Sequence, residues 1–205
     1  MLHKTHSETY SIAGKNITVA VPDSEEVLDY YKANKQASYW AQVWPAAIGL
    51  ATFIQTHPHL VKSKKVVELA AGLGLPGLVA AQYASSVLIT EKEALAIPFI
   101  YESVNQLGLN NVTAASLDWQ QVHTVDLPDV VLLSDVNYEP AIFAELKEVI
   151  EWLLAKNVRV IISTPQRLVA KEFINSVLVY AKEQWQTNVT LRDQDTAISV
   201  FVLMK

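Results

Sequence analysis

The sequence of 205 residues contains no cysteine and has no long apolar run. Without cysteine the chain forms no disulfide, thiolate nucleophile, cysteine-ligated zinc site or iron–sulfur cluster. The longest weakly polar stretch, residues 41–54, includes Gln42 and Pro45 and is shorter than the roughly 20 residues that span a bilayer. We therefore expect no membrane partner, and the absence of cysteine suits a reducing compartment.

An excess of positive charge is also missing, since the formal net charge is −5 at pH 7. A nucleic-acid partner requires a concentrated basic face, so we expect none. No apolar segment follows the first six residues, and we therefore expect no secretory signal and a cytoplasmic location. His57 and His59 are neighbours, but no acidic or cysteine cluster accompanies them, so we predict a surface loop and no metal site.

The composition and length indicate one globular domain. Apolar residues make up 51% of the sequence and charged residues 18%. The length gives a prior of about 1.4 domains, and no repeat or flexible linker marks a boundary. We predict a single domain over residues 1–205, in which residues 1–60 form an N-terminal hairpin and helical extension and residues 61–205 form the core.

The order of the predicted elements indicates the fold class. A hairpin over residues 9–20 turns at 13–16, and helices follow from Asp23 or Ser24 to about Lys35 and over residues 45–56. Strand-like runs then lie at residues 66–69, 87–90, 112–115, 130–133, 158–162, 187–191 and 197–203, with helical stretches at 75–83, 92–107, 140–155 and 167–183. This alternation predicts an α/β, Rossmann-like, doubly wound sheet of seven mostly parallel strands. Because no helix separates the last two strands, we expect the seventh to be antiparallel.

A glycine-rich turn follows the first core strand. Residues 72–77, Gly-Leu-Gly-Leu-Pro-Gly, connect that strand to a helix, and glycines let the backbone turn tightly and approach a ligand. Glu91 stands at the end of the second core strand, where a carboxylate accepts both hydroxyls of an adenosine ribose. Strand, glycines, helix and acid in this order predict a nucleoside cofactor.

Two cofactor classes fit the turn. It satisfies the dinucleotide pattern G-x-G-x-x-G, so an NAD-binding Rossmann oxidoreductase is one hypothesis. Pro76, however, lacks the N–H that a pyrophosphate uses at a helix N-terminus, and Glu68 would stand close to the phosphate charges. A cofactor with a cationic sulfur and an ammonium group suits Glu68 better, and S-adenosylmethionine has both.

Four segments in order resemble known methyltransferases. Residues 68–74 (ELAAGLG) resemble motif I of class I, seven-strand methyltransferases, usually E/D-x-G-x-G-x-G, with Ala70 in place of the first glycine. Residues 117–119 (LDW) and 135–138 (DVNY) resemble the L-D-W and D-x-x-Y motifs of the protein lysine methyltransferases of methyltransferase family 16. Residues 39–45 (YWAQVWP) resemble their aromatic W-P segment, which also occurs in electron-transfer-flavoprotein β-subunit lysine methyltransferases. Together the matches span residues 39–167.

The resemblance implies roles for the residues around the turn. Gly72 and Gly74 would bring the backbone close to the methionine part of S-adenosylmethionine. Glu68 would face the amino end of that methionine. Glu91 would bind the ribose, as its position at the strand end also indicates.

The resemblance also implies three more cofactor contacts. Asp118 would accept the adenine amino group, and Trp119 would pack against the adenine ring, because a flat π surface is desolvated well by an aromatic side chain. Trp44 would close the methionine end of the pocket. For both tryptophans the alternative is structural: Trp119 as an ordinary core aromatic, and Trp44 as an anchor of the N-terminal helix on the sheet.

Asp135 and Tyr138 are the candidate catalytic residues. Both follow the fourth core strand at the carboxyl edge of the sheet, where open α/β sheets bind ligands. We expect Asp135 to orient an acceptor ammonium rather than to act as a base; the alternative is a cap for the helix near Pro140. Arg167, after the fifth core strand, either lines the same cleft or is a solvated helix-start residue, and we favour the second.

These observations predict an S-adenosylmethionine-dependent N-methyltransferase whose substrate is a protein lysine. A small-molecule amine N-methyltransferase is the alternative within the same enzyme class, because one core serves many acceptors. An NAD-dependent oxidoreductase and a cofactor-binding regulatory module without chemistry are the others. The acidic net charge is compatible with a basic acceptor, and the sequence indicates no oligomeric state.

Overall fold

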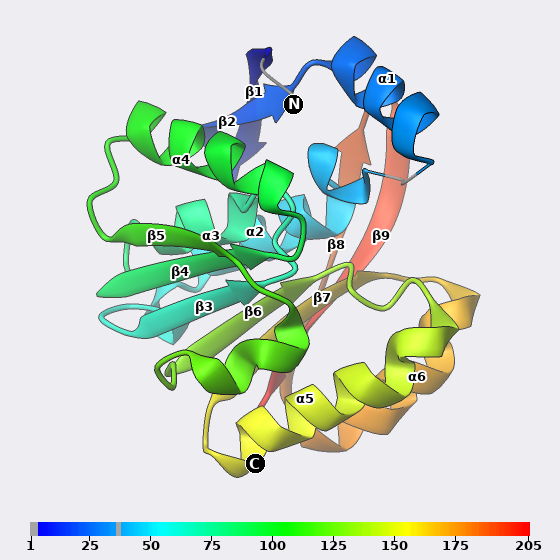
Figure 1. Ribbon diagram of the computed structural model, residues 1–205. Helices are drawn as coiled ribbons and strands as arrows, with labels where there is room; N and C mark the ends of the chain where they lie inside the picture. Colours follow the sequence, from blue (N-terminus) through cyan, green and yellow to red (C-terminus); the bar gives the residue numbers. More distant parts are fainter. Residues whose placement is uncertain (1–3, 36–37) are drawn as a thin grey trace.

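A mixed sheet of seven strands forms the centre of the protein, which is described by a computed structural model over residues 4–35 and 38–205. Its strands are β3 (Lys65–Leu69), β4 (Ser86–Glu91), β5 (Val112–Ser116), β6 (Val130–Ser134), β7 (Arg159–Pro165), β8 (Ala181–Leu191) and β9 (Gln194–Leu203). They lie in the order β5-β4-β3-β6-β7-β9-β8 (Figure 1). Strand β9 is antiparallel to both of its neighbours, while β3 to β7 pair in parallel. The predicted Rossmann-like fold, with its antiparallel last strand, is confirmed. The first three residues, on which the expectation of no secretory signal partly rests, lie outside the described ranges.

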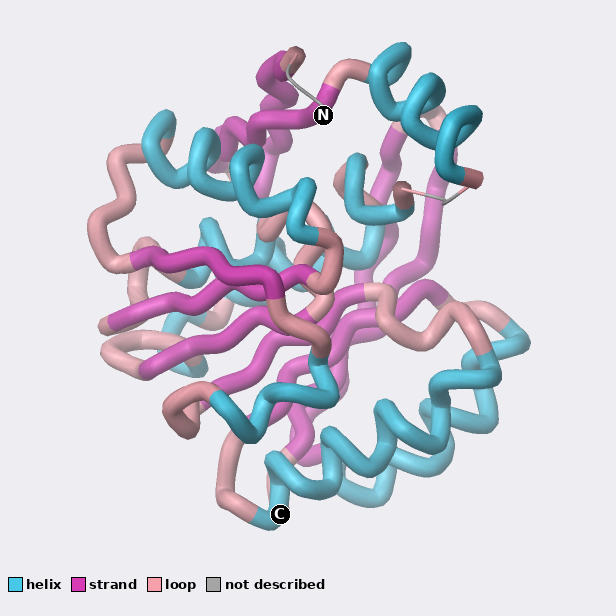
Figure 2. The backbone as a smooth tube through the Cα atoms, viewed as in Figure 1, coloured by secondary structure: helices cyan, strands magenta, loops and turns pink. Residues whose placement is uncertain are grey.

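Helices cover both faces of the sheet (Figures 1 and 2). On one face lie α2 (Pro45–Thr56), α3 (Leu75–Ala80) and α4 (Ile97–Gln106), and on the other α5 (Phe143–Ala155) and α6 (Lys171–Val177). The central strands are apolar on both sides: Leu132 packs in the first of these layers and Leu133 in the second. This two-sided burial is typical of a covered parallel sheet. Within the described ranges, no helix is both long and apolar enough to cross a membrane.

The N-terminal segment packs on the outside of α4. Strands β1 (Thr5–Ile12) and β2 (Lys15–Pro22) form the predicted hairpin, and the backbone N–H of Ala20 donates to Ser103 Oγ on α4 at 2.8 Å. Helix α1 (Ser24–Asn34) follows, and its N-cap is Asp23.

Helix α2 belongs in sequence to the predicted extension but lies against the core sheet. Ser163 Oγ on β7 donates to the carbonyl of Ala46 at 2.9 Å. A Cβ on Gly49 would stand 2.7 Å from Ile198 Cγ2 on β9, so glycine permits the close approach of helix and strand. The division at residue 60 remains a prediction, as does the single domain.

The chain after β7 differs from the predicted helix over residues 167–183. Helix α6 ends at Val177, a 3-10 turn covers Leu178–Tyr180, and β8 begins at Ala181. The polar start of β8 has a helix-like composition, but the backbone there pairs with β9, Ala181 opposite Leu203, at the edge of the sheet. Tertiary pairing overrides local propensity at such an edge, where charged side chains are common.

Candidate functional site

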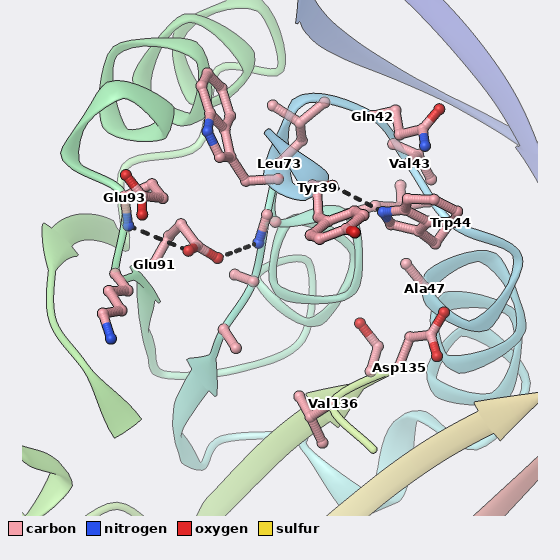
Figure 3. Close-up of a pocket in the computed structure, with 18 of the residues that line it drawn as sticks. Tyr39, Gln42, Val43, Trp44, Ala47, Leu73, Glu91, Glu93, Asp135 and Val136 are labelled. Carbon is pink, nitrogen blue, oxygen red and sulfur yellow. Dashed lines mark hydrogen bonds between the residues drawn. The ribbon is translucent and has the colours of Figure 1, made fainter. Parts of the chain in front are cut away.

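A cavity of about 460 Å³ opens at the carboxyl ends of β3, β4, β6 and β7. This is the edge at which open α/β sheets bind ligands, at the point where the strand order reverses. Here β4 and β5 lie on one side of β3, and β6 and β7 lie on the other. Its walls come from the segment before and at the start of α2, the glycine turn, and the ends of β4 and β6 (Figure 3). Trp119 and Arg167 also line it. It brings together seven of the nine predicted site residues, namely Trp44, Gly72, Gly74, Glu91, Trp119, Asp135 and Tyr138.

The turn after β3 requires its glycines. Gly72 has φ +56° and Gly74 φ +76°, in the left-handed region that side chains disfavour. A Cβ at Gly74 would lie 2.9 Å from Ile89 Cγ2, and one at Gly72 would lie 3.3 Å from the carbonyl oxygen of Trp40. Ala70 stands where the motif usually has its first glycine, and it also adopts a positive φ, +50°. The backbone keeps the glycine conformation there at a cost of roughly 1–2 kcal/mol.

The N-terminus of α3 is poorly suited to phosphate. Pro76 has no N–H, Gly77 N donates to Glu68 Oε2 at 2.7 Å, and Leu78 N donates to the carbonyl of Gly74 at 2.9 Å. Of the first four positions, only Leu75 is left with an N–H that none of these bonds uses. A pyrophosphate needs several free N–H groups at such an end. The geometry therefore disfavours the NAD hypothesis.

Glu68 lies behind the turn and does not reach the cavity wall. It is fully buried, Oε2 accepts from Gly77 N, and Oε1 has no hydrogen-bond partner within residues 4–35 and 38–205. Burial raises the pKa of this carboxyl to about 8, although the hydrogen bond from Gly77 opposes the shift. In this structure Glu68 holds the first turn of α3 and does not line the cavity, and its contact with the amino end of a cofactor stays a prediction.

The raised pKa of Glu68 predicts a pH-dependent stability. Between the ordinary value of 4.5 and about 8, folded Glu68 keeps a proton that the unfolded chain has lost, so stability falls as pH rises. The slope is at most about 1.4 kcal/mol per pH unit. Glu68→Gln removes this ionisation. We expect the melting temperature of the variant, relative to the natural chain, to rise steadily from pH 5 to pH 8 in thermal scans. A difference that is the same at every pH would show that the pKa of Glu68 is not raised in the folded protein.

Glu91 holds the glycine turn from the other side. Its carboxylate is buried at the end of β4, and it accepts from Gly72 N at 2.9 Å and from Glu93 N at 3.2 Å (Figure 3). Burial raises the pKa of Glu91, and these hydrogen bonds oppose the rise. A carboxylate has about four acceptor positions, so Glu91 retains acceptor capacity toward the cavity that it lines.

Asp118 is outside the cavity wall. It is the N-cap of a 3-10 helix, Trp119–Thr124, where Oδ1 accepts from Gln120 N at 3.1 Å, and Oδ2 lies 2.9 Å from Lys92 Nζ. The structure therefore shows a capping and ion-pairing role for Asp118 and does not bring it to the predicted adenine contact. The capping box that it forms with Gln121 is a sequence signal that the analysis of motifs missed.

Both predicted tryptophans line the cavity, and each is also fixed by a hydrogen bond. Trp119 Nε1 donates to Glu145 Oε1 on α5 at 2.8 Å, and Trp44 Nε1 donates to the carbonyl of Tyr39 at 2.8 Å. Trp44 is also the N-cap residue of α2. The structural and ligand-facing interpretations of these residues are therefore compatible, because each side chain is held by a hydrogen bond and also lines the cavity.

A pair of tyrosines stands at the rim. The rings of Tyr39 and Tyr138 are 5.8 Å apart and inclined at 52°, both line the cavity, and both are about half exposed. Burial and then the charge of Glu139 raise the pKa of Tyr138, so its hydroxyl stays protonated at neutral pH. Tyr39 was not a predicted site residue, although it opens the aromatic segment that resembles the family.

Asp135 forms an ion pair with Arg167. Arg167 Nη2 donates to Asp135 Oδ2 at 3.0 Å, and Nη1 donates to Oδ1. Asp135 does not cap the following helix, because that helix begins after Glu139 without a side-chain cap. Arg167 is the N-cap residue of the 3-10 helix Leu168–Ala170, so it does stand at a helix start, but it also lines the cavity and its guanidinium pairs with Asp135 instead of being free in solvent.

No group of three or more His, Cys, Asp or Glu side chains is placed to hold a metal ion in the described part of the chain. The ring of His57 instead stacks on Phe53, with centroids 4.4 Å apart.

Solved structures resemble this fold at low sequence identity. An RNA methyltransferase described as putative, from Pyrococcus horikoshii, superposes with a TM-score of 0.62 and 15% identity over 88% of this chain and 97% of its own. The N-methyltransferase NodS of Bradyrhizobium japonicum, solved with S-adenosyl-L-homocysteine, gives a TM-score of 0.59 and 13% identity over 78% of this chain and 86% of its own. These similarities establish the fold.

Relatives of known activity share more of the sequence. Histone-arginine methyltransferase METTL23 of Rattus norvegicus is 31% identical over 60% of this chain, and protein N-lysine methyltransferase METTL21A of Danio rerio is 32% identical over 63% of it. The matched regions span 57% and 62% of these relatives. Residues 24–180 match a family described as lysine methyltransferase, which is well over half of the chain. The protein belongs to the lysine methyltransferase family.

Proposed function

We propose that the protein is an S-adenosylmethionine-dependent methyltransferase whose acceptor is a lysine of another protein. The observation that best supports the cofactor is the glycine turn with its two carboxylates. Glu68 and Glu91 each bind a backbone N–H of this turn, at Gly77 and Gly72. Carboxyl groups on both sides occupy N–H groups that a pyrophosphate would need, and the acidic Glu91 at the cavity favours a cationic nucleoside over phosphates. A cytoplasmic location also remains a proposal, supported by the cysteine-free sequence.

We assign the cofactor contacts to residues of the cavity wall. The remaining lone pairs of Glu91 accept from the ribose hydroxyls, and the backbone at Gly72 and Gly74 follows the methionine part. Trp119 packs against adenine, and Trp44 closes the opposite end. Asp118 contributes indirectly by capping the 3-10 helix that begins at Trp119. Glu68 contributes indirectly through the first turn of α3.

When bound, S-adenosylmethionine supplies a methyl group on a positively charged sulfur. The chain's own residues have to align an acceptor with it and exclude water. The acceptor positions of Asp135 that Arg167 leaves free receive the N–H groups of a lysine ammonium, and Tyr39 and Tyr138 surround its alkyl stem. The amine must lose a proton before transfer, which costs roughly 4–5 kcal/mol at pH 7 from a pKa near 10.4.

The pairing of Asp135 favours lysine over arginine as the acceptor. A guanidinium binds best to a carboxylate whose two oxygens are both free for a fork of hydrogen bonds. Arg167 already occupies that fork. An ammonium is a compact charge and needs only single lone pairs. The relatives include both kinds of enzyme, histone-arginine methyltransferase METTL23 and protein N-lysine methyltransferase METTL21A, so the choice has to be measured.

Labelled cell extract tests the function. The protein is incubated with extract and methyl-labelled S-adenosylmethionine, and labelled bands are mapped by mass spectrometry. We expect label on lysine in a protein band. Label on arginine would overturn the assignment of lysine as the acceptor. Label only in the small-molecule fraction would support a small-amine methyltransferase. Cofactor binding without any transfer would support a regulatory module.

A further inference from the structure

The ion pair between Asp135 and Arg167 lies in the wall that we assign to the acceptor. The proposed function uses Asp135 to hold the acceptor and uses Arg167 only to occupy the fork that a guanidinium acceptor would need. We propose that Arg167 is a positioning residue that neutralises Asp135, so that the site binds an acceptor lysine without locking it in the unreactive ammonium form. This inference rests on the proposed lysine methyltransferase function.

The geometry of the pair is rigid. Asp135 follows β6 and Arg167 follows the neighbouring strand β7, so the sheet fixes both ends of the contact. Asp135 adopts a left-handed backbone, φ +54°, and its N–H donates to the carbonyl of Ser163 on β7 at 3.0 Å. The Asp135 side chain is 10% exposed and that of Arg167 35%, so solvent screens the pair only in part. Two parallel N–H···O bonds hold the guanidinium in register with the carboxylate.

An unpaired carboxylate would work against the reaction. An opposite charge within about 4–6 Å stabilises an ammonium and raises the pKa of the amine by about 1–3 units. The positive charge of Arg167 offsets this effect. The fork uses one acceptor position on each oxygen of Asp135, and a carboxylate has about four, so positions remain for the acceptor.

The other charged groups at the cavity are engaged elsewhere. Glu91 accepts from the N–H groups of Gly72 and Glu93, and Lys92 pairs with Asp118. Glu93 also lines the cavity, on the β4 side.

Two further titratable groups lie at or near the cavity. The phenol of Tyr138 stays neutral because its pKa is raised, and the rim on that side also carries Tyr39. Buried Glu68, with a pKa of about 8, titrates in the working range and is common to every variant below. Of the groups that line the cavity, Arg167 is the one that directly contacts Asp135 through a positive charge.

The consequence for transfer follows from the electron count. The lone pair of the neutral amine forms the new C–N bond while the C–S bond breaks, and the electron pair of that bond remains on sulfur. The proton lost from the ammonium before attack passes to solvent at the open rim. A site that lowers the cost of this deprotonation raises the rate at neutral pH, and the advantage vanishes at a pH where the amine is already neutral.

Single-turnover rates against pH test the proposal. Enzyme loaded with S-adenosylmethionine is mixed with a saturating peptide that spans the lysine mapped in labelled extract, between pH 6.5 and 10. For Arg167→Gln we expect the alkaline midpoint to move up by about one pH unit and the rate at pH 7.5 to fall about tenfold. The rates of variant and natural enzyme should converge toward pH 10, and KM for the peptide should not rise.

Matched variants separate charge from structure. Arg167→Lys keeps the positive charge and should retain the natural midpoint. Lys171→Gln removes an exposed charge on α6, outside the cavity, and should change nothing. Arg167→Met keeps the apolar stem and replaces the glutamine variant if that one melts below the assay temperature.

Two results would overturn the inference. One is a rate for the neutral variants that falls equally at every pH, and the other is no change at all. Both leave the proposed function standing, because the natural enzyme still methylates lysine. Absence of transfer by the natural enzyme, or label on arginine, would instead remove the proposed function and the inference together.

Discussion

Replacing Asp135 by asparagine is expected to reduce methyl transfer about 100-fold or more, while S-adenosylmethionine affinity stays within about tenfold. The substitution removes the charge that orients the acceptor ammonium and leaves Arg167 without its anion. Asparagine tolerates the left-handed backbone at this position, φ +54°, so the loss reports the charge. The measurement pairs single-turnover transfer with a calorimetric titration of the cofactor.

Two further variants make the Asp135 result specific. Asp135→Ala should abolish transfer and also lose about 1–2 kcal/mol of stability, because alanine is strained at positive φ. Asp126→Asn removes an exposed carboxylate outside the cavity and should leave transfer unchanged. Unimpaired turnover by the asparagine variant would rule out the orienting role of Asp135.

The second large effect is expected at Glu91. Glu91→Ala should weaken S-adenosylhomocysteine binding about 100-fold or more, because two charge-assisted hydrogen bonds to the ribose contribute about 1.5–3 kcal/mol each. The same change frees the N–H of Gly72 and loosens the turn that follows the methionine part. Calorimetric titration measures the affinity directly.

The control for Glu91 lies on α6. Glu172→Ala removes an exposed carboxylate of α6, outside the cavity, and should bind the ligand as the natural chain does. Equal affinities for the Glu91 variant and this control would show that the carboxylate does not bind the nucleoside.

The fold could be predicted from local patterns because each element carries its own signal. Apolar runs of four to seven residues mark buried strands, and the glycines at 72 and 74 sit where the chain must adopt positive φ. The antiparallel last strand followed from the missing helix before it. The start of β8 was assigned to a helix because its local composition is helix-like. Its pairing with β9, in which Ala181 lies opposite Leu203, joins residues that are far apart in the sequence.

The site was predicted less completely, for a related reason. Strand ends place Glu91 and Asp135 at one edge, which the topology alone indicates. Which partner a carboxylate selects depends on side-chain direction. Asp135 pairs with Arg167, 32 residues away, and Glu68 turns under α3 toward Gly77. No spacing rule in a single sequence encodes these contacts.

The most direct test of the cofactor assignment is a calorimetric titration of the natural protein with S-adenosylhomocysteine and, separately, with NADH. We expect saturable one-to-one binding of the sulfur nucleoside and no heat from NADH. Binding of NADH in the absence of any binding of S-adenosylhomocysteine or S-adenosylmethionine would contradict the assignment of this cavity.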